Sequence, residues 1–407
     1  MASPGPAGGT FAGSMLTPRQ LFLRHQAQTS EFPLLLEIER AEGVYMYTPE
    51  GRRILDLISG IGVSNVGHRH PRVLQAIHDQ LDKYLHLMVY GELVQAPPAR
   101  LAHALAATLP APLDTVYFTN SGAEAIEGAL KLAKRYTGRT GLVSSYNAYH
   151  GSTHGALSIT GSEEFKNSYR PLLPAVLHLR YNELADLALI TEHTAAVVLE
   201  TVQGEAGVRL PAPGYLPAVR QRCTAVGALL ILDEIQCGFG RTGTQWAFEQ
   251  FGVVPDILVC AKGMGGGMPI GAFISSPAIM AGFQTNPILG HCTTFGGHPV
   301  SCAAALATLQ VLQEENLLAS VAAKAARLRA QLVHPAIRAV RHCGLLMAVE
   351  FESFEVLKPI IDRALATEGI LTDWFLFCDN SLRIAPPLTI TEAEIDEACA
   401  GLLRAIG

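Results

Sequence analysis

Short apolar runs that end in a polar residue or a glycine, each followed by a stretch of helical composition, recur through the middle of the chain. Such runs are typical of strands in a parallel sheet, because helices cover both faces of the sheet. The pattern predicts strands at 115–119, 195–200, 228–233 and 257–261. We therefore predict an α/β fold with a mostly parallel central sheet and helices on both faces.

The pattern changes near residue 299 to long stretches with apolar residues at helical spacing. Strand-like segments and a last helix follow, and Thr391 and Glu394 stand at the start of that helix in the spacing of a capping box. The predicted elements are helices at 300–317 and 318–332 and strands at 345–351 and 382–385. We expect them to form a smaller α+β domain.

These changes predict four parts along the chain. Residues 1–17 are rich in glycine, proline, serine and alanine, and are expected to be a flexible tail without the features of a secretory signal. Residues 18–60 contain a hairpin pattern with a turn at Pro49 and are expected to pack with the small domain. Residues 61–298 form the predicted large domain, and residues 299–407 form the small one.

The composition narrows the class of protein. Of the 407 residues, 16% are charged, against about 25% in soluble domains, so either the core is large or subunits bury part of the surface. A net charge of −6 leaves no basic surface for nucleic acid. No apolar run approaches the roughly 18 residues that cross a bilayer. The eight cysteines lie in the second half and include no C-x-x-C pair, which favours a cytoplasmic protein.

Two successive predicted strands end in residues that can do chemistry. The run that starts at Ala228 ends in Asp233, and the next run leads directly into Lys262 and a glycine-rich loop. In open α/β folds, ligands bind at this carboxyl edge of the sheet. The alternatives are that Asp233 only caps the next helix and that Lys262 is an exposed loop residue.

Other motifs suggest different chemistry. Gly238–Gly243 matches G-x-G-x-x-G, which leaves a nicotinamide-dependent dehydrogenase as an alternative. However, the motif is separated from its strand, and no acidic residue follows about 20 positions later at a second strand end. The pairs His68/His70 and His150/His154 lack supporting ligands, so we expect no metal site.

A predicted strand also ends just before Asn120, where a helix begins. Free backbone amides at a helix start, with Gly122 allowing close approach, can hold a phosphate group. Ser121 and Glu124 have the spacing of a capping box, which is the simpler structural explanation. Both explanations can hold for one helix start.

Together these features resemble the class III pyridoxal-phosphate aminotransferases, the family of ornithine, acetylornithine and 4-aminobutyrate aminotransferases. The resemblance runs from about Tyr45 to the C-terminus. It implies fold type I of the pyridoxal-phosphate enzymes, with 61–298 as the cofactor-binding domain. The matching motifs are Gly67–Pro71, Asn120–Ala125, Tyr149–Gly151, Gln203–Gly207, Asp233–Gln236, Ala261–Gly263, Thr293–Gly297 and Arg383–Pro387.

The resemblance implies a role for five residues around the cofactor. Lys262 forms the internal Schiff base and later moves the proton, for which burial must lower its pKa. Asp233 keeps the pyridine nitrogen protonated, so that the ring can accept electrons. Gln236 hydrogen-bonds the ring hydroxyl, Tyr149 stacks on the ring, and His150 also belongs to the cofactor site.

The phosphate site is implied to be shared between two subunits. Ser121, Gly122 and Ala123 hold the phosphate from one chain, and Thr294 completes the site of the other chain. The resemblance therefore implies a homodimer.

Glu205 and Arg383 match a pair in which the glutamate covers the arginine during one half-reaction and leaves it in the other. An exposed arginine binds a carboxylate through two parallel hydrogen bonds. The pair implies a ping-pong aminotransferase that moves the ω-amine of a donor such as 4-aminobutyrate, ornithine or acetylornithine to 2-oxoglutarate. Family members that act as aminomutases, racemases or decarboxylases are the alternative.

The chain departs from the family pattern at two positions on the donor side. Ser152 stands where many members have an arginine that holds a donor carboxylate, and Ile61 stands where ornithine enzymes have a tyrosine. The sequence therefore leaves the donor open, and an amine without that carboxylate contact is an alternative.

Overall fold

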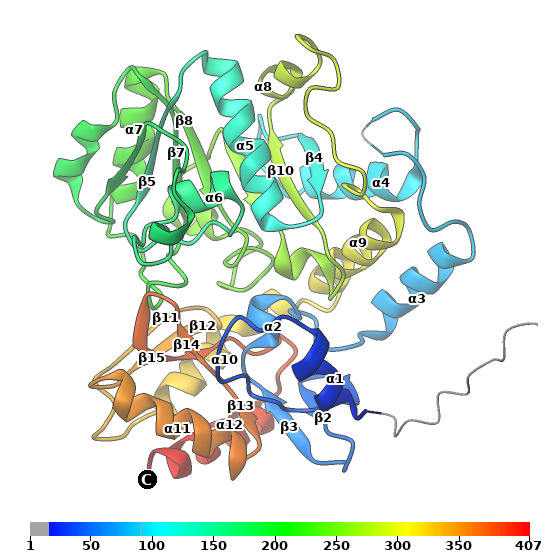
Figure 1. Cartoon of the computed structure of the whole chain (residues 1–407), viewed down its shortest axis with the longest axis vertical. Coiled ribbons are helices and arrows are strands. Elements are labelled where there is room, and N and C mark those ends of the chain that lie inside the picture. The colour runs from blue at the N-terminus through cyan, green and yellow to red at the C-terminus, as the bar shows by residue number, and fades with distance from the viewer. Residues whose placement is uncertain (1–15, 90) are drawn as a thin grey trace, which may run out of the picture.

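A seven-stranded sheet forms the centre of the larger part of the molecule (Figure 1). The computed structural model describes residues 16–89 and 91–407. The strand order is β4-β10-β9-β8-β7-β5-β6, and all neighbours are parallel except β10, which runs antiparallel to β4 and β9. The strands are β4 (Thr115–Thr119), β5 (Gly141–Ser145), β6 (Val176–Leu179), β7 (Thr194–Glu200), β8 (Leu229–Asp233), β9 (Ile257–Cys260) and β10 (Gly271–Ser275).

Helices cover both faces of this sheet, which explains the continuous apolar runs. Along β8, Ile231 packs in the cluster formed with α5 (Gly122–Thr137), and its neighbours Leu230 and Leu232 pack in the cluster that includes α7 (Tyr215–Val226). Every residue of β7, β8 and β9 is buried. The hydrophobic effect thus fixes both faces of these strands.

Two four-stranded sheets form the lower part in Figure 1. The first pairs β3 (Arg53–Asp56) in parallel with β13 (Ile370–Leu371), so strands from the two ends of the chain lie side by side. Its other strands are β1 (Arg40–Glu42) and β2 (Tyr45–Tyr47), and the second sheet consists of β11 (Ala339–Cys343), β12 (Leu346–Glu350), β14 (Trp374–Phe375) and β15 (Cys378–Ile384).

Most of the remaining helices pack around these sheets. The α-helices are α1 (Pro18–His25), α2 (Ser59–Gly62), α3 (Pro71–Leu81), α4 (Ala96–Ala106), α6 (His154–Ile159), α8 (Pro277–Met280), α9 (Pro299–Glu314), α10 (Leu317–Gln331), α11 (Phe354–Ala366) and α12 (Glu392–Ile406). The short 3-10 helices are η1 (Asn167–Tyr169), η2 (Leu184–Leu189), η3 (Ala247–Phe251), η4 (Lys262–Gly265) and η5 (Ala281–Phe283). The domain division predicted at residue 299 falls at the start of α9 and stays a prediction. The helix α9 packs against α3 and α4, which precede it in the chain, and against α10, which follows it.

The predicted α/β class is confirmed, and so are the four predicted strands of the large sheet. The hairpin of β2 and β3 and the capping box at Thr391 are also present. The strand predicted to begin at 382 begins earlier, at Cys378, because it pairs with β14 in a hairpin. Polar residues in that segment hide it from a search for apolar runs.

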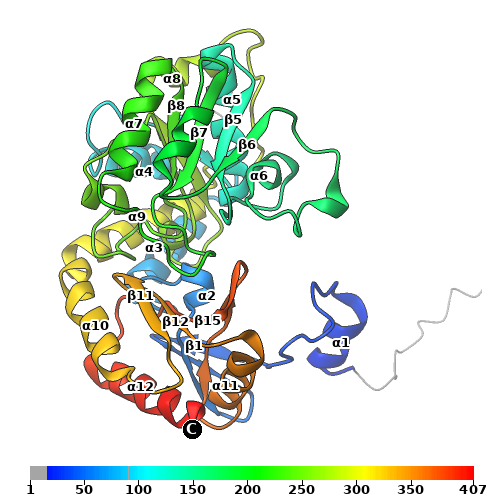
Figure 2. The ribbon, with the colours of Figure 1, turned by 90° about the vertical axis from the view of Figure 1, so that its left-hand side faces the viewer.

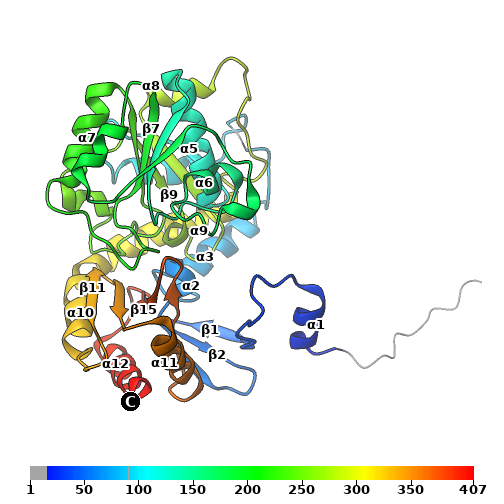
Figure 3. The same ribbon diagram turned by 60° about the vertical axis from the view of Figure 1, so that its left-hand side comes forward.

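The N-terminal helix α1 stands to the side of the rest of the chain (Figure 2, Figure 3). It buries none of its residues, and Leu21 and Leu23 are 46% and 50% exposed. The predicted tail over 1–17 lies almost wholly outside the described residues. No helix in the described part of the chain is long and apolar enough to span a membrane. All eight cysteines are free thiols in the structure.

Candidate active site

The carboxyl edge of the large sheet opens into a cavity of about 510 Å³. Strand β8 brings Asp233 to it, the turn after β9 brings Lys262, and the start of α5 forms another wall. The predicted site residues that line it are Ser121, Gly122, Ala123, Tyr149, His150, Ser152, Glu205, Asp233, Gln236 and Lys262. Arg383, Ile61 and Thr294 do not line it.

Asp233 is held in place by a buried histidine. His150 Nδ1 lies 2.7 Å from Asp233 Oδ2, and the other ring nitrogen of His150 lies 3.3 Å from the Ser144 hydroxyl. The backbone N–H of Ile235 donates to Asp233 Oδ1 at 2.9 Å. The carboxylate is therefore more than a cap for the next turn: it is an oriented, 3% exposed anion at the cavity wall.

Lys262 follows β9, which lies parallel and next to β8, the strand that ends in Asp233. Its backbone has a φ of +45°, which is rare for a residue with a side chain and marks a constrained position. Burial lowers the pKa of Lys262 below its usual value, because desolvation outweighs the attraction of Glu205 and Asp233 for a protonated amine. The result is a larger fraction of neutral, nucleophilic amine.

The start of α5 offers backbone amides to the cavity. Ser121 caps the helix through its hydroxyl oxygen, which accepts from Glu124 N at 3.2 Å. The predicted capping box is wrong in its second half, because Glu124 accepts from Asn120 N at 2.8 Å instead. Among the described residues, the amides of Ser121, Gly122 and Ala123 have no acceptor, as expected of a first helical turn that faces a ligand.

Two glycines keep this wall open. A Cβ on Gly122 would lie 2.7 Å from the Ile235 side chain, and a Cβ on Gly151 would lie 2.7 Å from the Ala123 side chain. Both distances are too short for real contacts. The two glycines thus let these segments pack closely around the helix start, where the free amides form a cradle that suits a phosphate group.

Gln236, Tyr149 and Ser152 also line the cavity. A Cβ on Gly204 would lie 1.7 Å from Gln236 Oε1, so a larger residue at 204 would push the Gln236 amide aside. Tyr149 and Ser152 share a hydrogen bond of 3.2 Å between their hydroxyls, and Ser152 is exposed. The position that could hold a donor carboxylate therefore has only neutral hydroxyls.

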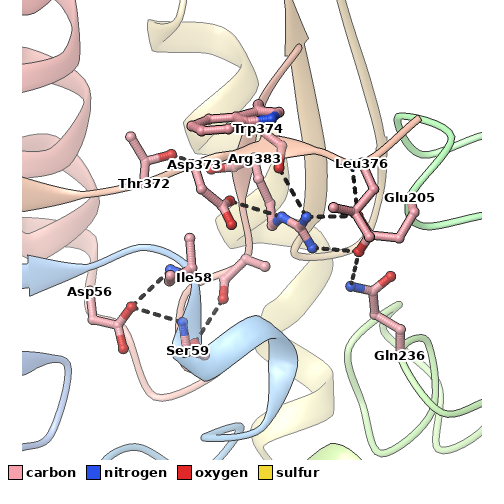
Figure 4. Close-up of polar contacts among 11 residues, drawn as sticks. Asp56, Ile58, Ser59, Glu205, Gln236, Thr372, Asp373, Trp374, Leu376 and Arg383 are labelled. Carbon is pink, nitrogen blue, oxygen red and sulfur yellow. Dashed lines mark hydrogen bonds and ion pairs between the residues drawn. The ribbon is translucent and has the colours of Figure 1, made fainter. Parts of the chain in front are cut away.

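Glu205 and Arg383 form a buried, two-point ion pair (Figure 4). Arg383 Nη1 and Nη2 donate to the two carboxylate oxygens at 2.8 and 2.9 Å. Burial alone would raise the pKa of Glu205, but Arg383 outweighs it, so the pKa lies below the usual value. Leu376 N also donates to this carboxylate at 3.0 Å. The structure thus contains the covered arrangement of the predicted pair.

The sequence did not reveal two further carboxylates at the site. Glu200 ends β7 beside Asp233, lines the cavity, and accepts from the amides of Gly204 and Tyr149 at 3.0 and 3.2 Å. Burial, followed by the charge of Asp233, raises the pKa of Glu200 well above its usual value. Asp373 lies 2.9 Å from Arg383 Nε. Glu200 could have been found from its position at the end of a predicted strand, whereas no sequence pattern indicates Asp373.

Ile61 lies in a left-handed turn rather than in an ordinary helix. The four residues labelled α2, Ser59–Gly62, all have positive φ, and Ile61 has a φ of +65°. The turn is held by Asp56, which accepts from the amides of Ile58 and Ser59 at 2.9 and 2.8 Å, and by Ser59, whose hydroxyl donates to Ala385 O at 2.8 Å (Figure 4). A β-branched residue is strained in this conformation.

Replacing Ile61 with asparagine should release this strain. Asparagine tolerates the left-handed region, and Ile61 is 39% exposed, so little burial is lost. We expect the free energy of unfolding to rise by about 1 kcal/mol, measured by urea denaturation. Ile61→Val keeps the β-branch and should give no gain. A loss of stability in Ile61→Asn would contradict the assignment of strain.

Thr294 is exposed and stands apart from the cavity of its own chain. Nearby Thr293 accepts from Asn120 Nδ2 at 3.0 Å, which ties this loop to the start of α5. The predicted contribution of Thr294 to a second subunit stays a prediction.

The model of the family described as Aminotransferase class-III matches residues 26–406. The acetylornithine aminotransferase of Methanopyrus kandleri is 38% identical over 95% of this chain and 98% of its own, and the putrescine aminotransferase of Pectobacterium atrosepticum is 41% identical over 87% and 78%. The amine transaminase of an uncultivated Pseudomonas species, solved in its pyridoxal-phosphate-bound form, superposes with a TM-score of 0.85 at 29% identity over 99% of both chains.

The fold and the cavity therefore define an aminotransferase of fold type I. The chain belongs to the class III aminotransferase family and is an enzyme that depends on pyridoxal phosphate. The donor set fits this cofactor: a lysine with a lowered pKa for the aldehyde, an oriented carboxylate for the ring nitrogen, and free amides in a glycine cradle for the phosphate.

The dehydrogenase alternative is wrong. The family excludes it, and Gly238–Gly243 does not begin a helix as a dinucleotide site requires. Instead Arg241 is fully buried there, and it donates to Leu345 O at 3.0 Å and to Asn65 Oδ1 at 2.6 Å. Arg241 thus connects the motif to two segments that are distant in sequence, those of Asn65 and Leu345. No group of side chains that could hold a metal occurs among the described residues.

Proposed function

We propose that this enzyme transfers the terminal amino group of an aliphatic amine to 2-oxoglutarate, in two half-reactions that use one cavity in turn. The observation that carries the proposal is the charge of the cavity. Among the described residues, Lys262 is the only lysine or arginine that lines it, and Arg383 lies behind Glu205. A carboxylate on the donor would therefore find no free cation.

Putrescine suits this cavity as a donor, because its far end is a second amine rather than a carboxylate. It is the substrate in the name of the 41% identical relative. The second candidate is an ω-amino acid such as ornithine, 4-aminobutyrate or acetylornithine. Acetylornithine is the substrate in the name of the 38% identical relative. Ser152 disfavours this group, because its hydroxyl cannot replace the arginine of many family members.

The residues of the cavity divide the work around the cofactor. When bound, pyridoxal phosphate supplies an aldehyde that takes up the amino group and a ring that stabilises negative charge on the neighbouring carbon. Lys262 would hold the aldehyde and, as a neutral amine, take the proton from the substrate carbon. Asp233 would pair with the ring nitrogen, Gln236 would bind the ring hydroxyl, and Tyr149 would cover the ring face.

Glu205 would control which substrate enters. While it covers Arg383, the cavity accepts an amine without a carboxylate near the reacting carbon. When Glu205 moves away, Arg383 Nη1 and Nη2 are free to bind the α-carboxylate of the 2-oxo acid in the same two-point geometry. Each half-reaction thus uses one state of the pair.

Two donors that differ only at the far end test this proposal. Putrescine and 5-aminopentanoate have the same chain of four methylenes, with an amine or a carboxylate at the end. We expect kcat/KM to favour putrescine by at least about tenfold, the effect of one carboxylate left without a charged partner. The assay uses 2-oxoglutarate as acceptor and pyruvate as comparison. A preference for 5-aminopentanoate would contradict the proposal.

Ser152→Arg should reverse this preference. The exposed position has room for an arginine, which would bind a donor carboxylate and repel a second ammonium. We expect kcat/KM for 5-aminopentanoate to rise by about tenfold and that for putrescine to fall. Ser168→Arg, which adds the same charge at an exposed position away from the cavity, should change neither value.

We also propose a cytoplasmic homodimer. A shared phosphate site would explain why Thr294 is exposed in one chain. The apolar residues left exposed on α1, Leu21 and Leu23, and a charged fraction of 16% are consistent with buried subunit surface. Free thiols at all eight cysteines suit a reducing compartment.

A further inference from the structure

Arg383 is paired with a second carboxylate besides Glu205 (Figure 4). Asp373 Oδ1 lies 2.9 Å from Arg383 Nε, close enough for an ion pair, although the N–H bond does not point at the oxygen as a hydrogen bond requires. Both atoms are buried, and neither has a hydrogen-bond partner among the described residues. Each is therefore the natural partner of the other.

The hairpin of β14 and β15 builds this contact. Arg383 N donates to Asp373 O at 2.9 Å, and Thr372 Oγ1 donates to Arg383 O at 2.6 Å, so these bonds hold Asp373, which directly precedes β14, beside Arg383 on β15. Arg383 Nη2 also donates to Trp374 O at 3.1 Å, and the guanidinium carbon lies 4.5 Å from the centre of the Phe375 ring. All of these contacts are independent of Glu205.

The two carboxylates differ in their access to substrate. Glu205 lines the cavity and pairs with the two terminal nitrogens of Arg383, whereas Asp373 does not line the cavity and faces Nε. An incoming carboxylate can therefore replace Glu205 but not Asp373. Burial lowers the pKa of Arg383, but Glu205 and Asp373 outweigh it, so the group stays charged. A buried guanidinium without any anion would be costly.

We propose that Asp373 is a positioning residue that holds Arg383 with its terminal nitrogens toward the cavity in both half-reactions. This inference rests on the proposed function, in which Arg383 binds the 2-oxo acid. When Glu205 leaves, Asp373 remains as the compensating charge. Arg383 then stays in place and binds the carboxylate at the edge that Glu205 has vacated.

Asp373→Asn tests the proposal through the two half-reactions, which are followed separately by the absorbance of the bound cofactor. The amine half-reaction, in which Glu205 still covers Arg383, should change by less than about twofold. In the 2-oxoglutarate half-reaction, KM should rise by about 10- to 100-fold with little change in the limiting rate, the effect of a misplaced binding group. Binding of glutarate, an unreactive dicarboxylate, should weaken by a similar factor in calorimetry.

Two variants complete the test. Asp379→Asn makes the same change at an exposed position on the same hairpin and should match the unaltered enzyme. Asp373→Glu keeps the charge, so its KM for 2-oxoglutarate should lie between those of the unaltered enzyme and Asp373→Asn. If Asp373→Asn does not fold, Asp373→Glu is used in its place. Equal losses in both half-reactions, or no loss in either, would overturn the proposal. If the unaltered enzyme reacts with amines but with no 2-oxo acid, the proposed function fails, and this inference fails with it.

Discussion

The Lys262→Ala enzyme is expected to lose both the visible absorbance of the lysine-bound cofactor and its transfer activity. Lys262 lines the cavity beside the end of β9, and its amine is the only one there among the described residues. Because the same amine would hold the cofactor and move the proton, kcat should fall by at least about 10,000-fold. Absorbance spectra and the half-reaction with an amine measure the two losses separately.

Two variants make this result specific. Lys83→Ala removes an exposed lysine and should keep both the spectrum and the activity. Lys262→Arg keeps a positive charge but offers no neutral amine, because arginine stays protonated in proteins. It should be as inactive as Lys262→Ala. An unchanged spectrum in either Lys262 variant would show that another residue holds the cofactor.

The second large effect is expected for Asp233→Asn. Asparagine has nearly the same shape and can still accept from Ile235 N, so the fold should be kept. It lacks the negative charge that would keep the ring nitrogen protonated, and the interaction with His150 is weakened. We expect kcat to fall by about 100- to 1,000-fold, as when one preorganised electrostatic contact is removed from an active site.

Asp256→Asn is the matched control for this charge. Asp256 accepts from Leu230 N at 2.7 Å and pairs with Arg220 at 2.6 Å, at the end of β8 remote from the cavity. Its loss should lower stability and leave kcat nearly unchanged. Should Asp233→Asn retain more than about a tenth of the activity, the charge of Asp233 would not be needed in the way proposed.

Elements with a strong local pattern could be predicted from the sequence. The strands β7, β8 and β9 contain continuous apolar runs because both faces are buried, and α9 and α10 have helical spacing and composition. The hairpin of β14 and β15 was only partly predicted. Asp379 and Asn380 lie in β15 and Asp373 directly precedes β14, so polar residues interrupt the apolar pattern on both sides of the hairpin.

In the candidate site, too, some features could be predicted from the sequence and others could not. Asp233 ends β8 and Lys262 follows β9, the next strand in the chain, which indicates that both residues lie at the carboxyl edge of the sheet. The contact between His150 and Asp233 could not be derived in this way, because the two residues are 83 positions apart in the sequence. Local spacing also misled at the start of α5, where the Glu124 carboxylate accepts from Asn120 N rather than from Ser121 N.

The fold class and the reactive groups of this protein could be predicted from local patterns, because apolar runs and motifs at strand ends act over short distances in the chain. The resemblance implied the pair of Glu205 and Arg383, but the contacts of His150 with Asp233 and of Asp373 with Arg383 were found in the tertiary structure alone. Arg383 lies 178 residues from Glu205, and it meets Asp373 across a hairpin whose register no local pattern predicts. Such contacts depend on how buried segments pack, since a charge taken from water must find its partner wherever the fold places it.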